Sequence, residues 1–415
     1  MNPFKETYKS IEKTYKNWKS INVKPYDKRE VDPYTRVRII LMNGTEFEAI
    51  WNTHRFTRHC PNNDVRRAMA LIRRSEQQQQ KRIANLKPRN ESILEHTLGY
   101  EQLAVDLTAI LAQREKNPYV KKQLDFALLE DFDHLYRYSN LLDLEKGIHA
   151  DTVIGNYTEA IPGRPTVSEP RHPYDDVNFY INNYLSDPIT RLNTSIITAA
   201  EQQTMNYYLN VANLYESEQG RKLYGEIAMI EEQHVTGYGC LSDPTVNMFE
   251  CMVMHEYTEC YLYWSCYNDE TDARIKDIWL MHFEEELSHL HSAVQLLAKY
   301  GGKVWQQLFP EGGDFPEPIL FKPQKEYVRK VLKSVRLTGN MEDFEDVDQL
   351  PERFRFFSYN RATLGSAENM ASHTVIAKHI AKTGEDFRLQ DKPHPISELA
   401  SRKEDNTEIG RIQGK

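Results

Sequence analysis

The chain has 415 residues, of which 40% are hydrophobic and 27% are charged, and its formal net charge at pH 7 is −9. This composition is that of an ordinary globular protein, and the length exceeds that of a typical single domain. Since there is no run of about 18 apolar residues and no apolar leader, we expect a cytoplasmic protein that does not enter a membrane.

The cysteines exclude two kinds of site. The chain has five of them, and none forms a Cys-x-x-Cys pair. Neither a zinc knuckle nor a rubredoxin-type iron site is therefore expected. Most of the cysteines lie on or beside predicted helices, where a free cysteine usually packs as a small apolar residue.

Residues 1–88 are expected to form a basic extension with short strands and one helix. The stretch YTRVRIILMNGTEFEAIW has two β-rich runs joined by an Asn-Gly turn, which predicts a hairpin. The helix follows from Asn63 and ends at Lys87-Pro88. Residues 1–90 contain 20 Lys and Arg against 9 Asp and Glu. No nucleic-acid-binding module is recognisable, so this arm is expected to lie against the acidic remainder of the chain and not on nucleic acid.

Residues 89–302 are predicted to form a helical bundle of three antiparallel hairpins. Short polar links join the two helices of each hairpin. A Pro-rich stretch of about forty residues separates the first hairpin from the second. Residues 303–415 are expected to form an extension with one or two helices and irregular segments. The six bundle helices are predicted at about 91–116, 118–146, 187–215, 217–236, 245–269 and 272–300.

Each hairpin carries the same ionisable side chains on the face that should be core. A carboxylate on its first helix is followed thirty residues later by a carboxylate on its second helix, and three residues after that comes a histidine. Because each hairpin turns near its midpoint, the two carboxylates should face each other. A buried carboxylate costs several kcal/mol unless it is paired or bound to a metal, so three such hairpins predict a metal site. The candidate ligands are Glu101, Asp131 and His134 in the first hairpin, Glu201, Glu231 and His234 in the second, and Glu256, Glu259, Glu286 and His289 in the third.

The ligand pattern resembles that of ferritin-like di-iron proteins. In that superfamily a Glu from each of two helices joins a Glu-x-x-His from each of two others. The hairpins at 187–236 and 245–300 look rubrerythrin-like, and Glu256-x-x-Glu259 resembles the paired third-helix acids of rubrerythrins. The resemblance covers about residues 91–300 and implies a mainly α, ferritin-like helical bundle. Carboxylate-rich ligation with one imidazole per metal suits iron, or alternatively manganese, better than zinc.

The pairing of the hairpins stays open at this point, because the superfamily needs two hairpins and this chain has three. If 91–146 completes the site with 187–236, Asp131 replaces the usual Glu. If 245–300 completes it, every ligand is standard, and this pairing is slightly preferred. A shared or additional site that uses all three hairpins is the third option.

The resemblance implies a di-iron oxidoreductase that reacts with dioxygen or hydrogen peroxide. Since no rubredoxin motif is present, an external electron-donor protein is expected, and a homodimer is one option for the assembly. The alternative is a non-catalytic bundle that binds or stores iron. Ferritins that build cages are short chains, so the long terminal additions favour the enzyme. Tyrosines close to the ligand faces are expected mainly to pack in the core.

Overall fold

The computed structural model describes residues 1–160, 170–332, 337–365 and 370–385 and is mainly helical. None of the helices in these ranges is both long and apolar enough to cross a bilayer. The chain divides into two compact units that do not follow the predicted boundaries near residues 88 and 302, and residues 386–415 of the predicted extension lie outside the described ranges. Unit 1 comprises Met1–Glu91, Ile181–Gln203 and Asp243–Phe321, and unit 2 comprises Ser92–Tyr180, Thr204–Ser242 and Lys322–Lys415.

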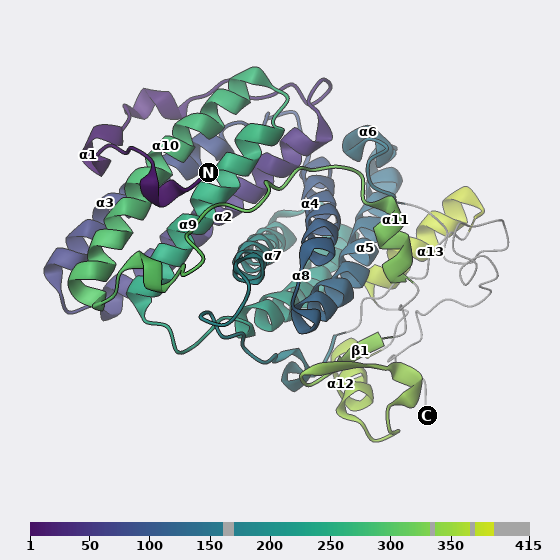
Figure 1. The fold of residues 1–415 in the computed structure, drawn as a ribbon. Helices are drawn as coiled ribbons and strands as arrows, with labels where there is room; N and C mark the ends of the chain where they lie inside the picture. The colour runs from purple at the N-terminus through teal and green to yellow at the C-terminus, as the bar shows by residue number, and fades with distance from the viewer. Residues whose placement is uncertain (161–169, 333–336, 366–369, 386–415) are drawn as a thin grey trace. The chain divides into compact units, whose positions relative to one another are not determined.

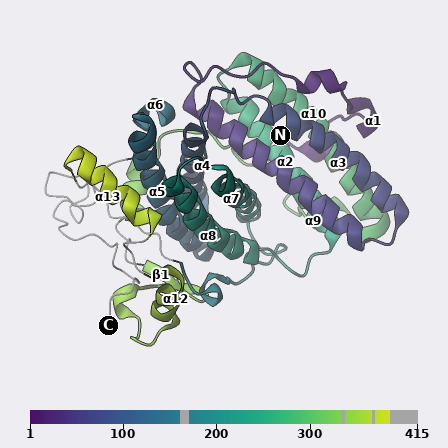
Figure 2. The same cartoon turned by 180° about the vertical axis from the view of Figure 1, so that it is seen from behind.

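Unit 1 is built around four long helices that lie side by side in both views (Figures 1 and 2). Helix α2 packs against α3 and α9, and α10 packs against α9 and α3. The long helices are α2 (Pro33–His59), α3 (Asn63–Ala84), α9 (Met248–Asp269) and α10 (Ala273–Leu296). The short ones are η1 (Pro3–Lys5), α1 (Ile11–Thr14), η2 (Trp18–Ile21), η4 (Leu297–Gly301) and η5 (Trp305–Gln307).

The β-hairpin predicted before residue 60 is wrong, because this stretch forms helix α2. Asp32 caps the helix through a bond from the backbone N–H of Tyr34, and Pro33 occupies its first position. The glycine of the expected Asn-Gly turn lies within the helix. A Cβ on Gly44 would come within 2.8 Å of the Gln203 side chain, so close packing requires this glycine.

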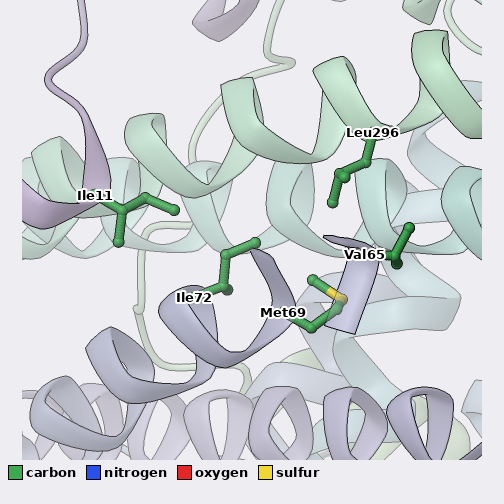
Figure 3. Close-up of a cluster of buried hydrophobic side chains, with 5 residues drawn as sticks. All are labelled: Ile11, Val65, Met69, Ile72 and Leu296. Carbon is green, nitrogen blue, oxygen red and sulfur yellow. The ribbon is translucent and has the colours of Figure 1, made fainter. Parts of the chain in front are cut away.

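A cluster of apolar side chains shows how α3 faces the core of unit 1 (Figure 3). Val65, Met69 and Ile72 recur at helical spacing along α3, and Leu296 of α10 and Ile11 of α1 pack against them. The same stripe continues one turn beyond Ile72 to Glu76, which is fully buried. The stripe that anchors α3 therefore carries a carboxylate into the interior.

Unit 2 contains α4 (Ile93–Arg114), α5 (Pro118–Lys146), α8 (Glu218–Cys240) and the end of α7 (Pro188–Leu214) from Thr204 onward. Helix α5 packs against α4 and α8, and α13 packs against α5 and α8. Figure 2 shows α4, α5 and α8 side by side. The other elements are α6 (Asp151–Ile154), η3 (Pro173–Asp176), α11 (Lys325–Val331), η7 (Val347–Gln349), α12 (Arg355–Leu364), α13 (Ala371–Thr383) and the antiparallel strands β1 (Leu337–Asn340) and β2 (Asp343–Asp346).

The four long hairpins form two consecutive pairs, and within each pair the second hairpin repeats the first at an offset of 55 residues. The second helix of a hairpin is capped by Asn62 in α2–α3 and by Asn117 in α4–α5, and the two caps are 55 residues apart. The same offset relates Ser217 and Asp272, which cap α8 and α10. The first and last hairpins build unit 1, and unit 2 contains the second hairpin and α8 of the third. Each unit therefore contains one member of each pair of repeated hairpins, in whole or in part, and the segments of the two units alternate along the sequence.

Candidate metal centres

Five predicted ligands come together in unit 2. One ligand atom from each of Asp131, Glu231 and His234 lies within 4.8 Å of the others, and the same holds for Glu101, His134 and Glu231. All five side chains are at most 4% exposed. Glu231 belongs to both groups, so its carboxylate could contribute a ligand atom to a cation in either one.

The imidazoles of the two candidate ligands His134 and His234 face the carboxylate of Glu231. His134 Nδ1 is 2.9 Å from Glu231 Oε1, and His234 Nδ1 is 3.2 Å from Glu231 Oε2. His234 Nδ1 also lies 3.5 Å from Asp131 Oδ1. Burial alone would raise the pKa of Glu231, but the imidazoles of His134 and His234 lower it. Glu231 is therefore ionised at neutral pH, the state that a metal ligand requires.

The carboxylate of Glu130, which the sequence analysis missed, contacts the ring nitrogen of His234 that points away from Glu231. The Nε2 atom lies 2.9 Å from Glu130 Oε2, and Arg171 Nη1 donates to both oxygens of Glu130 at 2.7 and 2.8 Å. Burial opposes ionisation of Glu130, but Arg171 and His234 lower its pKa. Because an ionised carboxylate can only accept, Nε2 donates to Glu130, and Nδ1 is the ring nitrogen that faces Glu231 and Asp131.

Buried tyrosines surround the other end of the unit 2 site. The Tyr208 hydroxyl of α7 donates to Glu101 Oε1. The ring centroids of Tyr138, Tyr208 and Tyr224 are 4.8 to 5.7 Å apart. Burial raises the pKa of each of the three phenols, so all stay protonated. They form a packed aromatic core, as the sequence analysis favours, and one of them also orients a candidate ligand.

A small pocket in unit 2 reaches His234. Its volume is about 30 Å³, and its lining includes Ala127, Arg171, Gln233 and Gly237. A water needs roughly 10–15 Å³ of such space. The pocket is therefore large enough for a water-sized molecule beside a candidate ligand.

Unit 1 brings the candidate ligands of hairpin 245–300 together with Glu76, a carboxylate that the sequence analysis missed, and Glu46, which it also missed, interacts electrostatically with Glu76 and Glu286. Glu46 comes from α2 and Glu76 from α3. One ligand atom from each member lies within 4.8 Å of the others in three overlapping groups. These groups are Glu76 with Glu256 and His289, Glu76 with His255 and Glu259, and Glu256 with Glu259 and Glu286.

The carboxyls of unit 1 differ electrostatically from those of unit 2. Burial, with the negative charge of Glu286, raises the pKa of Glu76 to about 8, although His289 opposes the shift. Burial and neighbouring carboxylates also raise the pKa values of Glu256 and Glu259. Among the glutamates of the three ligand groups, Glu286, beside His289, has its pKa lowered against the effect of burial. Without a cation, ionisation is therefore disfavoured for most of this cluster.

The preferred pairing of hairpins 187–236 and 245–300 is wrong. In unit 2, α8 of hairpin 187–236 meets α5 of hairpin 91–146 through His134 and Glu231. In unit 1, the amide of Gln79 on α3 donates to Glu286 Oε1 on α10. Since residues 33–59 are helical, hairpin α2–α3 is available to cover the ligand faces of α9 and α10.

Glu46 and Glu76 follow the same spacing as the predicted ligands, so the sequence pattern could have found them. They are thirty residues apart, as are the carboxylates of the three predicted hairpins. In the sequence repeat of 55 residues, Glu46 corresponds to Glu101 and Glu76 corresponds to Asp131.

Glu201 is buried on α7, in the part of the helix that belongs to unit 1. It corresponds to Glu256 at the offset of 55, and its assignment as a ligand stays a prediction.

Comparisons of the chain with protein families, with curated proteins and with solved structures found no match.

Proposed function

We propose that unit 2 binds a pair of iron or, alternatively, manganese ions, and that the protein is a ferritin-like oxidoreductase that reacts with dioxygen or hydrogen peroxide. The observation that carries the proposal is the buried set of three carboxylates and two imidazoles, in which Glu231 is common to both groups. A dedicated electron-donor protein belongs to the same proposal, because the chain has no Cys-x-x-Cys pair.

The donor atoms fit such a metal pair. Carboxylate oxygen and imidazole nitrogen together suit iron and manganese. Three carboxylates buried in one unit would repel one another, and two dications offset that repulsion. The contact of His234 with Glu130 adds the outer partner that metal-binding histidines commonly have.

The chain's own residues position the site and limit access to it. When bound, the metal pair supplies the redox chemistry of the reaction. Glu130 fixes the orientation of His234, and Tyr208 orients Glu101 through its hydroxyl. The ligands stand on long helices, which hold geometry better than loops. The pocket of about 30 Å³ favours a reactant of the size of dioxygen or peroxide.

The test is repeated oxidation of the reduced, iron-loaded full chain. Mixing with dioxygen or hydrogen peroxide should return the iron to the diferric state within seconds, and the iron-to-protein ratio should stay constant over repeated cycles. The rate should be lost in Glu231→Ala. Uptake of further ferrous iron at each oxidation, well beyond the initial content, would replace this proposal by iron storage.

A further inference from the structure

We propose that unit 1 holds a second metal centre of its own, completed by Glu76 of hairpin α2–α3, that takes hard divalent cations such as Mn²⁺ or Fe²⁺. This inference goes beyond the proposed function of unit 2 and does not depend on it. Its donors come from α3, α9 and α10, and Glu46 of α2 interacts electrostatically with Glu76 and Glu286.

The geometry provides for two cations. Glu76 is common to two groups, one with Glu256 and His289 and the other with His255 and Glu259. A carboxylate has two oxygens, so Glu76 can bridge one cation in each group. Tyr263 donates its hydroxyl to Glu46 Oε1 and lies 3.1 Å from His282 Nδ1, which orients Glu46.

An unpartnered side chain points independently to a ligand. Glu76 is 0% exposed, and neither of its carboxylate oxygens has a hydrogen-bond partner within the described part of the chain. The same is true of His289 Nε2. Buried polar atoms nearly always have a partner, and an exception needs an explanation such as an ion. A protonated acid cluster alone would leave these atoms unsatisfied, whereas a cation would satisfy the oxygens of Glu76.

The ligand set of unit 1 differs from that of unit 2 but has not lost its ability to bind a metal. Gln79 occupies the position that corresponds to His134, so one imidazole is lost from α3. His255, on α9, supplies an imidazole within the ligand group of Glu259. Glu259 of unit 1 stands at the position that corresponds to Thr204 of unit 2, so unit 1 has a carboxylate where unit 2 has a hydroxyl. Unit 1 thus keeps two imidazoles and gains an acid, which is a changed donor set and not a lost one.

Manganese binding tests the inference. Mn²⁺ is titrated into metal-stripped full chain, and the bound ion is counted from the loss of the free-ion EPR signal. The double variant Glu76→Gln, Glu256→Gln should bind two fewer ions per chain than the unaltered protein. Glu48→Gln is the matched control, since Glu48 lies on α2 but accepts from Asn52 at 2.7 Å, and it should bind as many. Equal binding by the double variant and the unaltered protein would overturn the inference.

Failure of the unit 2 proposal would look different. The variant Glu231→Ala, His234→Ala should keep two Mn²⁺ ions, whether or not unit 2 binds metal in the unaltered protein. Loss of all Mn²⁺ from that variant, with its helical circular dichroism intact, would overturn the inference. If the double variant at Glu76 and Glu256 folds poorly, an anomalous difference map of the unaltered Mn²⁺-loaded protein decides: a peak beside Glu76 supports the second centre, and its absence contradicts it.

Discussion

Units 1 and 2 use one helical plan with different surroundings for the candidate ligands. An offset of 55 residues relates Glu46 to Glu101, Glu76 to Asp131 and Glu286 to Glu231. Each unit also has a tyrosine that donates to the first carboxylate of its site, Tyr263 in unit 1 and Tyr208 in unit 2. What is repeated is therefore the placement of carboxylates on facing helices and the hydroxyl that orients one of them.

The difference lies in how each unit compensates its buried charge. Unit 2 places Glu130 and Arg171 behind His234, whereas Ser75 stands at the position in unit 1 that corresponds to Glu130. The pKa of Glu231 is accordingly lowered, and that of Glu76 is raised. If both proposed sites bind metal, the carboxylate of Glu231 would already be charged before the metal arrives, whereas ionisation of Glu76 would depend more on the cation itself.

The largest effect is expected from a double substitution that should remove the metal of unit 2 and leave that of unit 1. Glu231→Ala with His234→Ala removes the shared carboxylate and one imidazole of unit 2, so that unit should lose its metal ions and the oxidation rate. Helicity should be largely unchanged. The control is Glu232→Ala, because Glu232 is exposed on the same helix and accepts from Thr236. Elemental analysis that finds unchanged metal in the double variant would remove the assignment.

The pH dependence of the metal-free protein should have opposite signs in the two sites. Glu76 binds its proton more tightly in the folded state, since its pKa rises from 4.5 to about 8. The free energy of unfolding should therefore fall as pH rises through that range, by up to about 1.4 kcal/mol per pKa unit. Glu231 has a lowered pKa, so its contribution is lost as pH falls below the usual carboxyl range.

Urea unfolding in the presence of a chelator measures this effect. Glu76→Gln should flatten the decline of stability between pH 5 and pH 8, and added Mn²⁺ should restore stability at pH 8 in the unaltered protein. A decline that is equally steep in Glu76→Gln would show that the charge on Glu76 is not its source.

A smaller effect is expected from the outer partner of His234. Glu130→Gln keeps the shape of the side chain but removes the charge that orients the imidazole and pairs with Arg171. Metal affinity of unit 2 should fall by roughly 10- to 100-fold. Competition with a chelator measures it, and Ser75→Ala in unit 1 is the matched control, with no change expected. An unchanged affinity in Glu130→Gln would show that Glu130 does not support the site.

The smallest effects are expected from the tyrosines. Tyr208→Phe and Tyr263→Phe each remove one hydroxyl that donates to a buried carboxylate. A bond to a charged group contributes about 1.5–3 kcal/mol and one to a neutral group about 0.5–1.5 kcal/mol. Since the pKa of Glu46 is raised by burial and by Glu286, Tyr263→Phe should cost an amount in the lower of these two ranges without metal. Thermal unfolding measures the cost in both variants, and a loss in Tyr263→Phe well above about 1.5 kcal/mol would contradict a neutral Glu46.

The long helices between residues 91 and 300 are predicted well because five of them, α4, α5, α8, α9 and α10, begin at a clear capping residue. Asn117 and Asp272, for example, cap α5 and α10 where the sequence places the links. Helix α2 is missed for a physical reason. It is buried on several faces, so its buried run from Val37 to Met42, apolar except for Arg38, lacks the one-sided stripe that distinguishes a surface helix.

The candidate ligands on amphipathic helices are also predictable, but their grouping is not. Spacing places Asp131 and Glu231 on core faces, yet it does not say which hairpins pack together. The nesting of the first hairpin with the last joins Glu76 to His289 across more than two hundred residues. Glu130 and Arg171 escape prediction because neither belongs to the repeated pattern, and their role depends on tertiary contact with His234.

Anomalous diffraction at the iron and manganese edges is the most direct test of the metal centre in unit 2. The crystals should contain the full chain, purified from cells supplied with both metals. The account predicts a pair of anomalous peaks that share Glu231, one near His134 and the other near His234. A folded protein without anomalous scatterers beside Glu231, even after soaking with excess Mn²⁺ or Fe²⁺, would contradict it.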